Sequence, residues 1–483
     1  MSFLSVPFFL LVTIAVVAFQ LSPPRFRAHV LLGASLGFYA SYGPAYAVLL
    51  LLAATLGVHQ AALAIERRES ESAKLRLVTV SVTGLTVLLA AFKLASTLFP
   101  WAAANAAAEP GVLRVLVPLG LSYYLFKLIA YLLEVYWENL PAERSFVALA
   151  LYAAFFPQVV SGPIQRPGEF FAQVQGFQRF DAASATQGLR RILFGLFKKI
   201  AIADRLATLV NAQHQNPGAY SSLELLLGAY LFALQLYADF SGVTDLAIGI
   251  GQLFGVKAPE NFDLPFFSRN LQEYWRRWHM SLTSWLADYL FTPLRMALRD
   301  YGKLGLAFAV FVNMVAVGVW HGVAWTYLAF GVLHGVFLVV SVLTLKPRDA
   351  FFAKHPLLQR VRRVSGPLVT FQLVVLGLVI FRADSLGQAA QYLSRLIGWA
   401  EPGTIAATRL DFKLLTVSPK AIGTICMLGA LMECVHWVQR RPALARRFVE
   451  APAAYRWAFY YGVVVLTLAM SRLGEGNFIY AQF

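Results

Sequence analysis

No Asp, Glu, Lys or Arg occurs in the stretch from Leu304 to Leu345. An uncharged, largely apolar run of this length fits two helices of about 20 residues each, enough to cross a bilayer twice. Similar apolar runs recur along the chain, which is 58% hydrophobic and only 14% charged, too apolar for an ordinary soluble protein. The sequence therefore predicts an all-α polytopic membrane protein with about eleven transmembrane helices plus re-entrant or interfacial helices.

The first apolar run, Val6 to Leu21, has no preceding basic region and no small-residue cleavage site, so it is expected to be a retained span. Residues 29–58 are long enough for two helices with a break near Gly43 and Pro44. No clear internal repeat is visible, which weakens an inverted-repeat transporter interpretation. Further spans are expected at Leu77–Phe99, Pro110–Val135, Ser145–Val160, Leu223–Leu253, Pro367–Phe381, Ile422–Val438 and Trp457–Met470.

Basic residues exceed acidic residues by 41 to 25, giving a net charge of +16. Most of them fall in short segments between apolar runs, where they fix orientation and touch anionic lipid headgroups. The segments around Arg25 and from Ile65 to Arg76 are candidate cytoplasmic loops, but basic loops are spread so widely that the inverted topology stays open. No nucleic-acid-binding motif is visible, so nucleic acid is not an expected partner. The two cysteines, Cys426 and Cys434, lie in one apolar run and exclude a disulfide framework.

Three polar segments interrupt the apolar pattern. The segment after Phe156, FPQVVSGPIQRP, cannot continue a helix, and it is either a surface loop or a re-entrant segment that lines a cavity. The segment from Gly188 to Ala207, GLRRILFGLFKKIAIADRLA, is expected to be a helix near the membrane interface with its basic residues on one side. The segment ADFSGVTD is expected to break the run Leu223–Leu253, and its Asp239 and Asp245 should face a protein interior or a watery cavity.

The stretch 261–335 is expected to be the core of a single membrane domain that covers residues 1–483. Leu271–Leu290 has the spacing of one amphipathic helix, with His279 at the edge of its aromatic face. An interfacial helix with an aromatic belt explains this pattern without any catalysis. The apolar positions that form the face are Leu271, Tyr274, Trp275, Trp278, Leu282, Trp285, Leu286 and Tyr289.

Two further histidines follow in the uncharged run. Counting residues along two spans places His321 near the turn between them and His334 nearer the middle of the second, so His334 is favoured as the intramembrane residue. Imidazole moves protons to and from hydroxyls near neutral pH, and two histidines in one cavity could activate an acceptor hydroxyl. No GxSxG elbow, zinc-spaced Cys/His cluster, Walker A loop or dinucleotide fingerprint is present, so no metal or bound cofactor is expected.

Several segments resemble the membrane-bound O-acyltransferase family in its bacterial alginate O-acetyltransferase branch. The resemblance is carried by YWRRWHMSLTSWLADYLFTPL and GVWHGVAWTYLAFGVLHG, and also by FFPQVVSGPIQRP, GLFKKIAIADRLA, LYADFSGVTDLAIGIGQLFGV, NFDLPFFSRN, VIFRADSLGQAAQYL and FIYAQF. One departure is Ala481, at a position that the family usually fills with an aromatic residue. The pattern NMVAVGVWHG is shared with relatives that transfer D-alanine toward teichoic acid, so the family is better determined than the branch.

The resemblance implies a ring of helices around a thin centre with a central tunnel. It makes His321, in the WHG motif, the catalytic histidine and His279 a second functional histidine, against the span count, and it leaves His334 as a supporting residue. Residues that match the family's motifs and are expected to line or support the cavity are Tyr237, Asp239, Ser241, Asp245, Arg276, Trp278, Asn313 and Trp320.

The resemblance also implies a function. An acyl group, in the first place acetyl, would pass from a cytoplasmic thioester donor, acetyl-CoA or an acyl carrier, across the bacterial inner membrane. An extracytoplasmic acetyltransferase partner protein would complete O-acetylation of a polysaccharide such as alginate. Alternatives are D-alanyl transfer of the teichoic-acid type, an acyl or polysaccharide transporter without thioester chemistry, and a scaffold for extracytoplasmic machinery.

Overall fold

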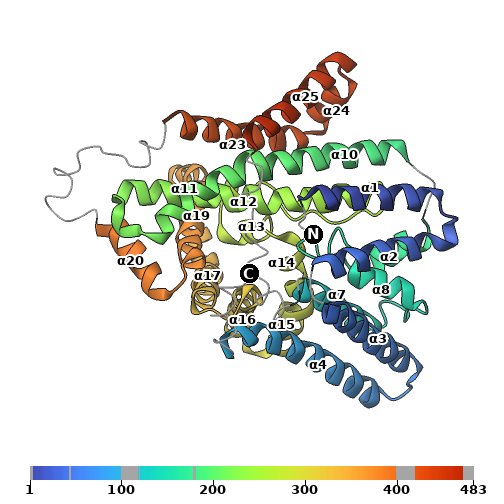
Figure 1. Ribbon diagram of the computed structural model, residues 1–483. Coiled ribbons are helices and arrows are strands. Elements are labelled where there is room, and N and C mark those ends of the chain that lie inside the picture. The colour runs from blue at the N-terminus through green and yellow to red at the C-terminus, as the bar shows by residue number, and fades with distance from the viewer. Residues whose placement is uncertain are drawn as a thin grey trace. The chain divides into compact units, whose positions relative to one another are not determined.

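The computed structural model describes residues 4–42, 45–98, 118, 120–177, 181–398 and 419–471. Within these ranges the chain is helical (Figure 1), and the extended pairing is confined to an isolated bridge between Phe262 and Trp278. The expected all-α polytopic class is confirmed. The terminal segment FIYAQF, with Ala481, lies outside the described residues.

The chain divides into two compact units. The first comprises Met1–Ile192 and Thr244–Glu260, and the second comprises Leu193–Val243 and Asn261–Phe483. Helices α10 (Ala182–Leu196) and α12 (Ser222–Leu253) contribute residues to both units. The other helices of the first unit are α1 (Val6–Leu21), α2 (Pro24–Tyr42), α3 (Ala45–Arg67), α4 (Glu71–Leu98), α7 (Leu121–Tyr136), α8 (Phe146–Ala154) and α9 (Pro167–Gln175).

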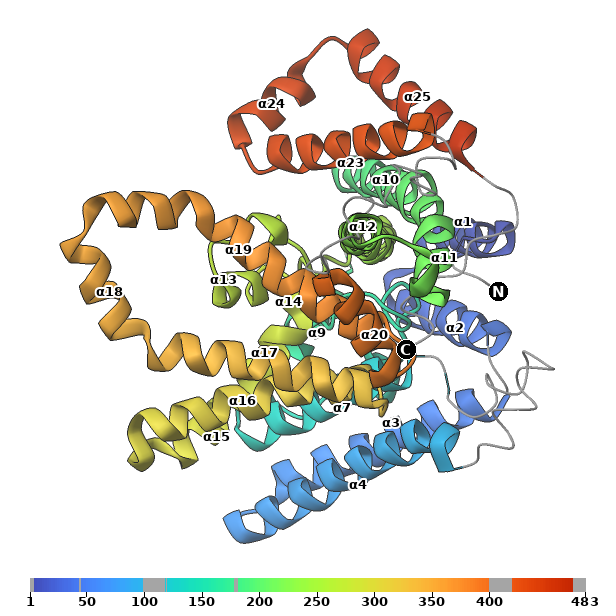
Figure 2. The ribbon, with the colours of Figure 1, turned by 90° about the vertical axis from the view of Figure 1, so that its left-hand side faces the viewer.

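The second unit carries the stretch that the sequence singles out. Its helices α16 and α17 lie side by side (Figure 2). Its α-helices are α11 (Asp204–Gln215), α13 (Leu271–Trp275), α14 (Met280–Leu286), α15 (Thr292–Ala297), α16 (Gly302–His321), α17 (Trp325–Leu343), α18 (Leu345–Lys354), α19 (Pro356–Arg382), α20 (Leu386–Ile397), α23 (Pro419–Gln439), α24 (Pro442–Glu450) and α25 (Ala453–Met470). The π-helical segments are η1 (Phe197–Ala203) and η4 (Ala287–Phe291), and short 3₁₀ turns are η2 (Pro217–Ala219), η3 (Pro265–Phe267) and η5 (Arg299–Tyr301).

Seven helices in the described part of the chain are long and apolar enough to cross a membrane. They confirm a multi-pass protein, although the sequence suggests about eleven spans. Among the expected spans outside these seven, Val6–Leu21 forms a shorter apolar helix, and Pro110–Val135 and Ser145–Val160 yield only α7 and the nine-residue α8 within the described residues. The seven spans are Tyr46–Arg67, Glu71–Ala95, Ser222–Leu253, Arg299–His321, Trp325–Leu343, Pro356–Arg382 and Ala453–Met470.

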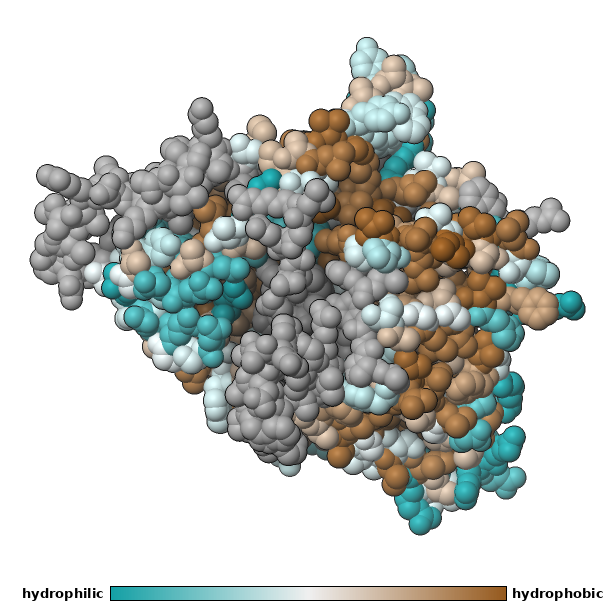
Figure 3. All heavy atoms as spheres, in the orientation of Figure 1, coloured by the Kyte–Doolittle hydropathy of each residue, from teal (hydrophilic) through white to brown (hydrophobic). Residues whose placement is uncertain are grey.

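The shorter apolar helix α1 has one buried and one exposed apolar face. Its inner face buries Phe8, Val12, Ala15 and Phe19, whereas large apolar side chains on the other face are between 53% and 81% exposed. Figure 3 shows the corresponding hydrophobic surface over the N-terminal helices. A helix that is apolar on both faces is stable where one face packs on protein and the other contacts hydrocarbon.

The irregular segment 155–165 in the first unit is buried along its length, which excludes the surface-loop alternative. Lys127, on α7, donates from Nζ to Oε1 of Gln158 at 2.7 Å and to the carbonyl of Tyr152 at 3.2 Å. The Gln158 amide in turn donates to Oε1 of Gln165 at 2.8 Å. Buried side chains therefore supply the hydrogen bonds that water would supply to a surface loop.

Two sequence expectations about local structure are wrong. The charged segment Ile65–Arg76 is mostly helix, because α3 ends at Arg67 and α4 begins at Glu71. The segment ADFSGVTD does not break α12, which runs unbroken from Ser222 to Leu253. Gly242 lies within it and allows close packing, since a Cβ there would meet the carbonyl oxygen of Gly195 at 2.9 Å.

The basic helix predicted near the interface is also different. Lys198 and Lys199 are each only 1% exposed and lie in the π-helical segment η1 rather than on an outer face. A π-helix shifts the side-chain register by one residue, and such segments occur frequently at functional sites. Both lysines belong to the second unit and are buried there.

Candidate active site

The expected helix Leu271–Leu290 is interrupted before its middle. Helix α13 ends at Trp275, and α14 begins at Met280 after His279 adopts a left-handed backbone conformation, with φ 45° and ψ 52°. All eight residues of the predicted aromatic face are nevertheless buried in the protein. The aromatic face therefore belongs to the core, and the interfacial-belt interpretation is wrong.

Asn261 holds this turn in place, and the sequence analysis did not single it out. Its carbonyl accepts the backbone N–H of Met280 at 2.9 Å, and its side-chain Oδ1 accepts the N–H of Ser281 at 3.1 Å. His279 gives α14 no side-chain cap, so Asn261 supplies the missing acceptors from another segment of the chain. A left-handed residue other than glycine persists only where its surroundings enforce it.

We expect Asn261→Ala to destabilise the fold by about 1 kcal/mol, the usual cost of a lost helix cap, and to lower activity as well. The activity falls because the turn that presents His279 loosens. Thermal unfolding and transfer rates of the purified protein check this. Ser385→Ala removes the cap of α20, where Oγ accepts the N–H of Gln388 at 3.1 Å, and should cost similar stability without the loss of activity. Equal activity in the two variants would contradict the role of Asn261.

His321 is the last residue of α16 and is only 5% exposed, so it is not a surface turn residue. Its imidazole makes edge contacts with Trp320 and Phe381, each with ring centroids 4.9 Å apart. Close packing of α16 on α17 fixes this end of the helix. A Cβ on Gly318 would collide with the carbonyl oxygen of Tyr327, and one on Gly331 would meet the carbonyl of Met314 at 2.7 Å.

The structure brings His279 and His321 to the same aromatic group. His279 lies 5.3 Å from Trp320, the indole that also contacts His321, and 4.6 Å from Phe240 of α12. Burial lowers the pKa of His279 to about 3, so its ring is neutral at neutral pH. A neutral imidazole can position or polarise a substrate through a hydrogen bond, which suits a supporting role better than that of a strong base.

His334 has its own set of ring contacts. It is fully buried on α17 against Phe330, at 4.6 Å, and Trp275, at 5.3 Å. Neither ring nitrogen has a hydrogen-bond partner among the described residues. A Cβ on Gly377 would collide with its Nε2, so α19 packs directly on the ring. These contacts indicate that His334 packs beside the pair rather than joining it.

The four polar residues of the α12 motif, Tyr237, Asp239, Ser241 and Asp245, lie in different surroundings. Tyr237 donates to, or accepts from, Nδ1 of His436 at 3.2 Å and contacts Trp278 at 6.2 Å. Ser241 is buried in the same unit, whereas Asp245 belongs to the first unit, where Arg191 donates to it at 2.8 Å. Asp239 and Asp245 are six residues apart on a straight helix, so they point in different directions. The motif residues therefore contact different neighbours and do not form one cluster.

Asp239 forms a buried ion pair that the sequence analysis did not predict. Its carboxylate is fully buried and lies 2.7 Å from Nζ of Lys199, which also contacts Asp204 at 2.7 Å. The charged lysine of the FKKIAIAD segment thus bridges two aspartates. The only sequence signal was an intramembrane acid together with a nearby basic pair, without information on their pairing.

The remaining predicted residues occupy three environments. Trp278 is buried and stacks on Tyr274 with centroids 5.7 Å apart, so it is part of the aromatic core below the turn. Asn313 lies on α16 two turns before His321 and does not adjoin it. Arg276 is exposed and lines a pocket. Within the described ranges no cluster of three or more His, Cys, Asp or Glu residues could hold a metal ion.

Comparison with known proteins supports the family. Residues 139–361, which include His279, His321 and His334, match the model of the membrane-bound O-acyltransferase family. A probable alginate O-acetylase of Pseudomonas fluorescens is 32% identical over 443 residues, which cover 87% of this chain and 81% of that protein. The chain belongs to the membrane-bound O-acyltransferase family. It is therefore an enzyme of the acyltransferase class, as the resemblance implies.

Two further relatives of this acyltransferase differ in the reaction that their names give. A probable alginate O-acetylase of Pseudomonas putida is 36% identical over 298 residues, 61% of this chain and 58% of that protein. A teichoic acid D-alanyltransferase of Streptococcus thermophilus is 30% identical over 288 residues, 54% of this chain and 68% of that protein. Identity is thus higher to the alginate enzymes than to the D-alanyl enzyme.

Proposed function

We propose that this acyltransferase moves an acetyl group from a cytoplasmic thioester, acetyl-CoA or an acyl carrier, toward an extracytoplasmic polysaccharide such as alginate. The observation that carries the proposal is the pair of buried imidazoles at one indole, His279 and His321 beside Trp320, in a chain whose relatives include alginate O-acetylases. We place it in the bacterial inner membrane with an extracytoplasmic acetyltransferase as partner.

In this proposal His321 acts as the base. Its imidazole takes the proton of an acceptor hydroxyl, the oxygen attacks the thioester carbonyl, and a tetrahedral intermediate forms. The C–S bond then breaks, and the imidazolium returns the proton to the departing thiolate. His279 hydrogen-bonds to a reacting oxygen and does not itself change charge. The aromatic walls exclude water, which would otherwise hydrolyse the thioester.

D-alanyl transfer is the second candidate, favoured by the similarity to the Streptococcus enzyme. The two differ in the acyl group, and a transporter differs from both because it leaves the thioester intact. The experiment is vesicle-reconstituted protein with donor on one side, labelled separately in the acyl group and in the thiol carrier. Acyl label crossing while the carrier label stays behind supports transfer. If both labels cross together, the protein is a transporter, and D-alanyl thioester outcompeting acetyl thioester would favour the second candidate.

A further inference from the structure

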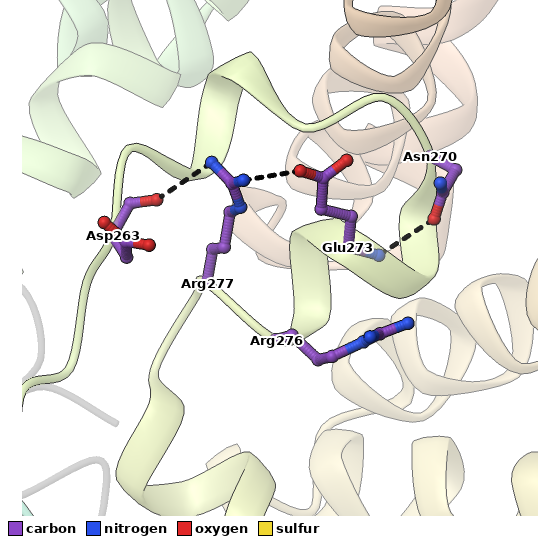
Figure 4. A pocket seen from close by; sticks show the side chains of 5 residues that line it. All are labelled: Asp263, Asn270, Glu273, Arg276 and Arg277. Atoms are coloured by element: carbon purple, nitrogen blue, oxygen red, sulfur yellow. Dashed lines mark hydrogen bonds and ion pairs between the residues drawn. The ribbon is translucent and has the colours of Figure 1, made fainter.

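A polar pocket of about 440 Å³ lies in the second unit beside the His279 turn. Figure 4 shows its five lining residues, which come from α13 and the segments on either side of it. They are Asp263, Asn270, Glu273, Arg276 and Arg277. The segment from Arg276 to His279 joins this pocket to the aromatic site.

Both carboxylates of the pocket are already neutralised. Glu273 forms an ion pair with Arg277 at 2.5 Å and accepts the backbone N–H of Arg269 at 2.8 Å. Asp263 forms an ion pair with Arg440, whose Nη2 also donates to the Asp263 carbonyl at 3.2 Å. Two acids are therefore balanced by two arginines, and neither acid is available to a third cation.

Arg276 is the cation that remains. Its side chain is exposed, it extends away from the Arg277–Glu273 pair in Figure 4, and it has no carboxylate partner in the described part of the chain. A planar guanidinium with free donors at the edge of a neutralised pocket is suited to phosphate, which it can bind through two parallel hydrogen bonds. The pocket thus favours an anionic ligand.

Helix α19 connects the segment next to this pocket with His321. Gly366, the eleventh residue of α19, packs against the carbonyl of Arg269, which precedes the pocket residue Asn270, and near the end of α19 Phe381 contacts His321. Fifteen residues of helix separate the two contacts, a rise of about 22 Å. A ligand held by its phosphate at the pocket would need a long, thin arm to place a reactive group beside His321, and an extended pantetheine chain is of comparable length.

We propose that Arg276 binds the phosphate of the donor's phosphopantetheine arm, so that the thioester at the other end reaches the two histidines. This inference rests on the proposed function, because it identifies where that thioester donor is held. The shared chemistry is the phosphorylated pantetheine, which occurs both in coenzyme A and on a carrier protein.

The kinetic test compares acetyl-phosphopantetheine with acetyl-pantetheine, which lacks the phosphate. We expect Arg276→Gln to raise KM for acetyl-phosphopantetheine about tenfold, the usual loss for one charged hydrogen-bonded contact, and to leave acetyl-pantetheine unchanged. Arg276→Lys should recover part of the loss. Arg295→Gln removes an exposed charge on α15 outside the pocket and serves as the matched control. Equal effects of Arg276→Gln on both donors, or no effect on either, would overturn the proposal.

Binding of coenzyme A to protein in nanodiscs separates this inference from the proposed function. Coenzyme A should bind His321→Ala as it binds the wild type and should bind Arg276→Gln about tenfold more weakly. Coenzyme A binding that is independent of Arg276, with phosphatidylglycerol binding that depends on it, would mean a lipid headgroup site and would overturn the inference. Binding of a carrier protein can be measured with and without its phosphopantetheine arm. If Arg276→Gln weakens binding only when the arm is present, the result supports the inference and identifies the carrier as the source of the phosphate. If coenzyme A binding depends on Arg276 but no thioester is cleaved, the phosphate site is supported and the proposed function is contradicted.

Discussion

His321→Ala is expected to fold as the wild type does and to lose acyl transfer by about 10²–10⁴-fold, the usual contribution of a general base. The fold should survive because His321 is the last residue of α16, where its side chain makes only edge contacts with neighbouring rings. The packing of α16 on α17 depends instead on Gly318 and Gly331. The rate falls because the neighbouring His279, whose pKa is lowered to about 3 by burial, is too weak a base to replace His321. Thioester consumption by purified protein in vesicles measures it.

The matched control is another buried histidine of the same unit. His334→Leu removes an imidazole that has no hydrogen-bond partner among the described residues, and it should retain far more activity than His321→Ala. Normal thermal unfolding of His321→Ala is required before its loss of rate is assigned to chemistry. Wild-type transfer by a folded His321→Ala would contradict the assignment of the base, and the reverse ranking of the two variants would move it to His334.

Lys199→Met is expected to destabilise the protein by about 3–5 kcal/mol, the cost of leaving a buried charge without its partner. Asp239 is fully buried, and the 2.7 Å contact with Lys199 is what compensates its negative charge. The substitution removes that cation from a fully buried carboxylate. Thermal unfolding in detergent micelles should show a large decrease in Tm.

Two further variants separate this ion pair from ordinary packing. Lys303→Met replaces an exposed lysine at the start of α16 and should change Tm little. The double variant Lys199→Met with Asp239→Leu should recover part of the lost stability, because it removes the uncompensated acid as well. A Tm for Lys199→Met that matches Lys303→Met would show that the pair is not important for stability.

Hydrophobic patterning predicted the elements that depend on lipid and core contact. The uncharged run Leu304–Leu345 forms two helices as expected, and every apolar position chosen on Leu271–Leu290 is buried. Both results follow from the period of the helix, which a local sequence pattern contains. The same pattern could not distinguish an interfacial face from a core face, because the two have the same spacing.

What the sequence did not predict depends on partners far along the chain. The turn at His279 exists because Asn261 accepts two N–H groups, and the burial of Lys199 follows from the π-helical register and from Asp239 on another helix. Span counting placed His321 near a turn and favoured His334 as the intramembrane residue, on the assumption of straight helices and a flat membrane boundary. His321 is instead enclosed by its sequence neighbour Trp320 and by Phe381 of α19, and Phe381 lies next to it only after folding.

The most direct test of the central claim is release of free thiol from acetyl-CoA by the purified protein in vesicles, for the wild type beside His321→Ala. The account predicts thiol release that requires His321 and increases when an acceptor and the extracytoplasmic partner are supplied. Equal thiol release by the wild type and a folded His321→Ala would contradict it, as would acyl groups that cross the membrane with the thioester intact.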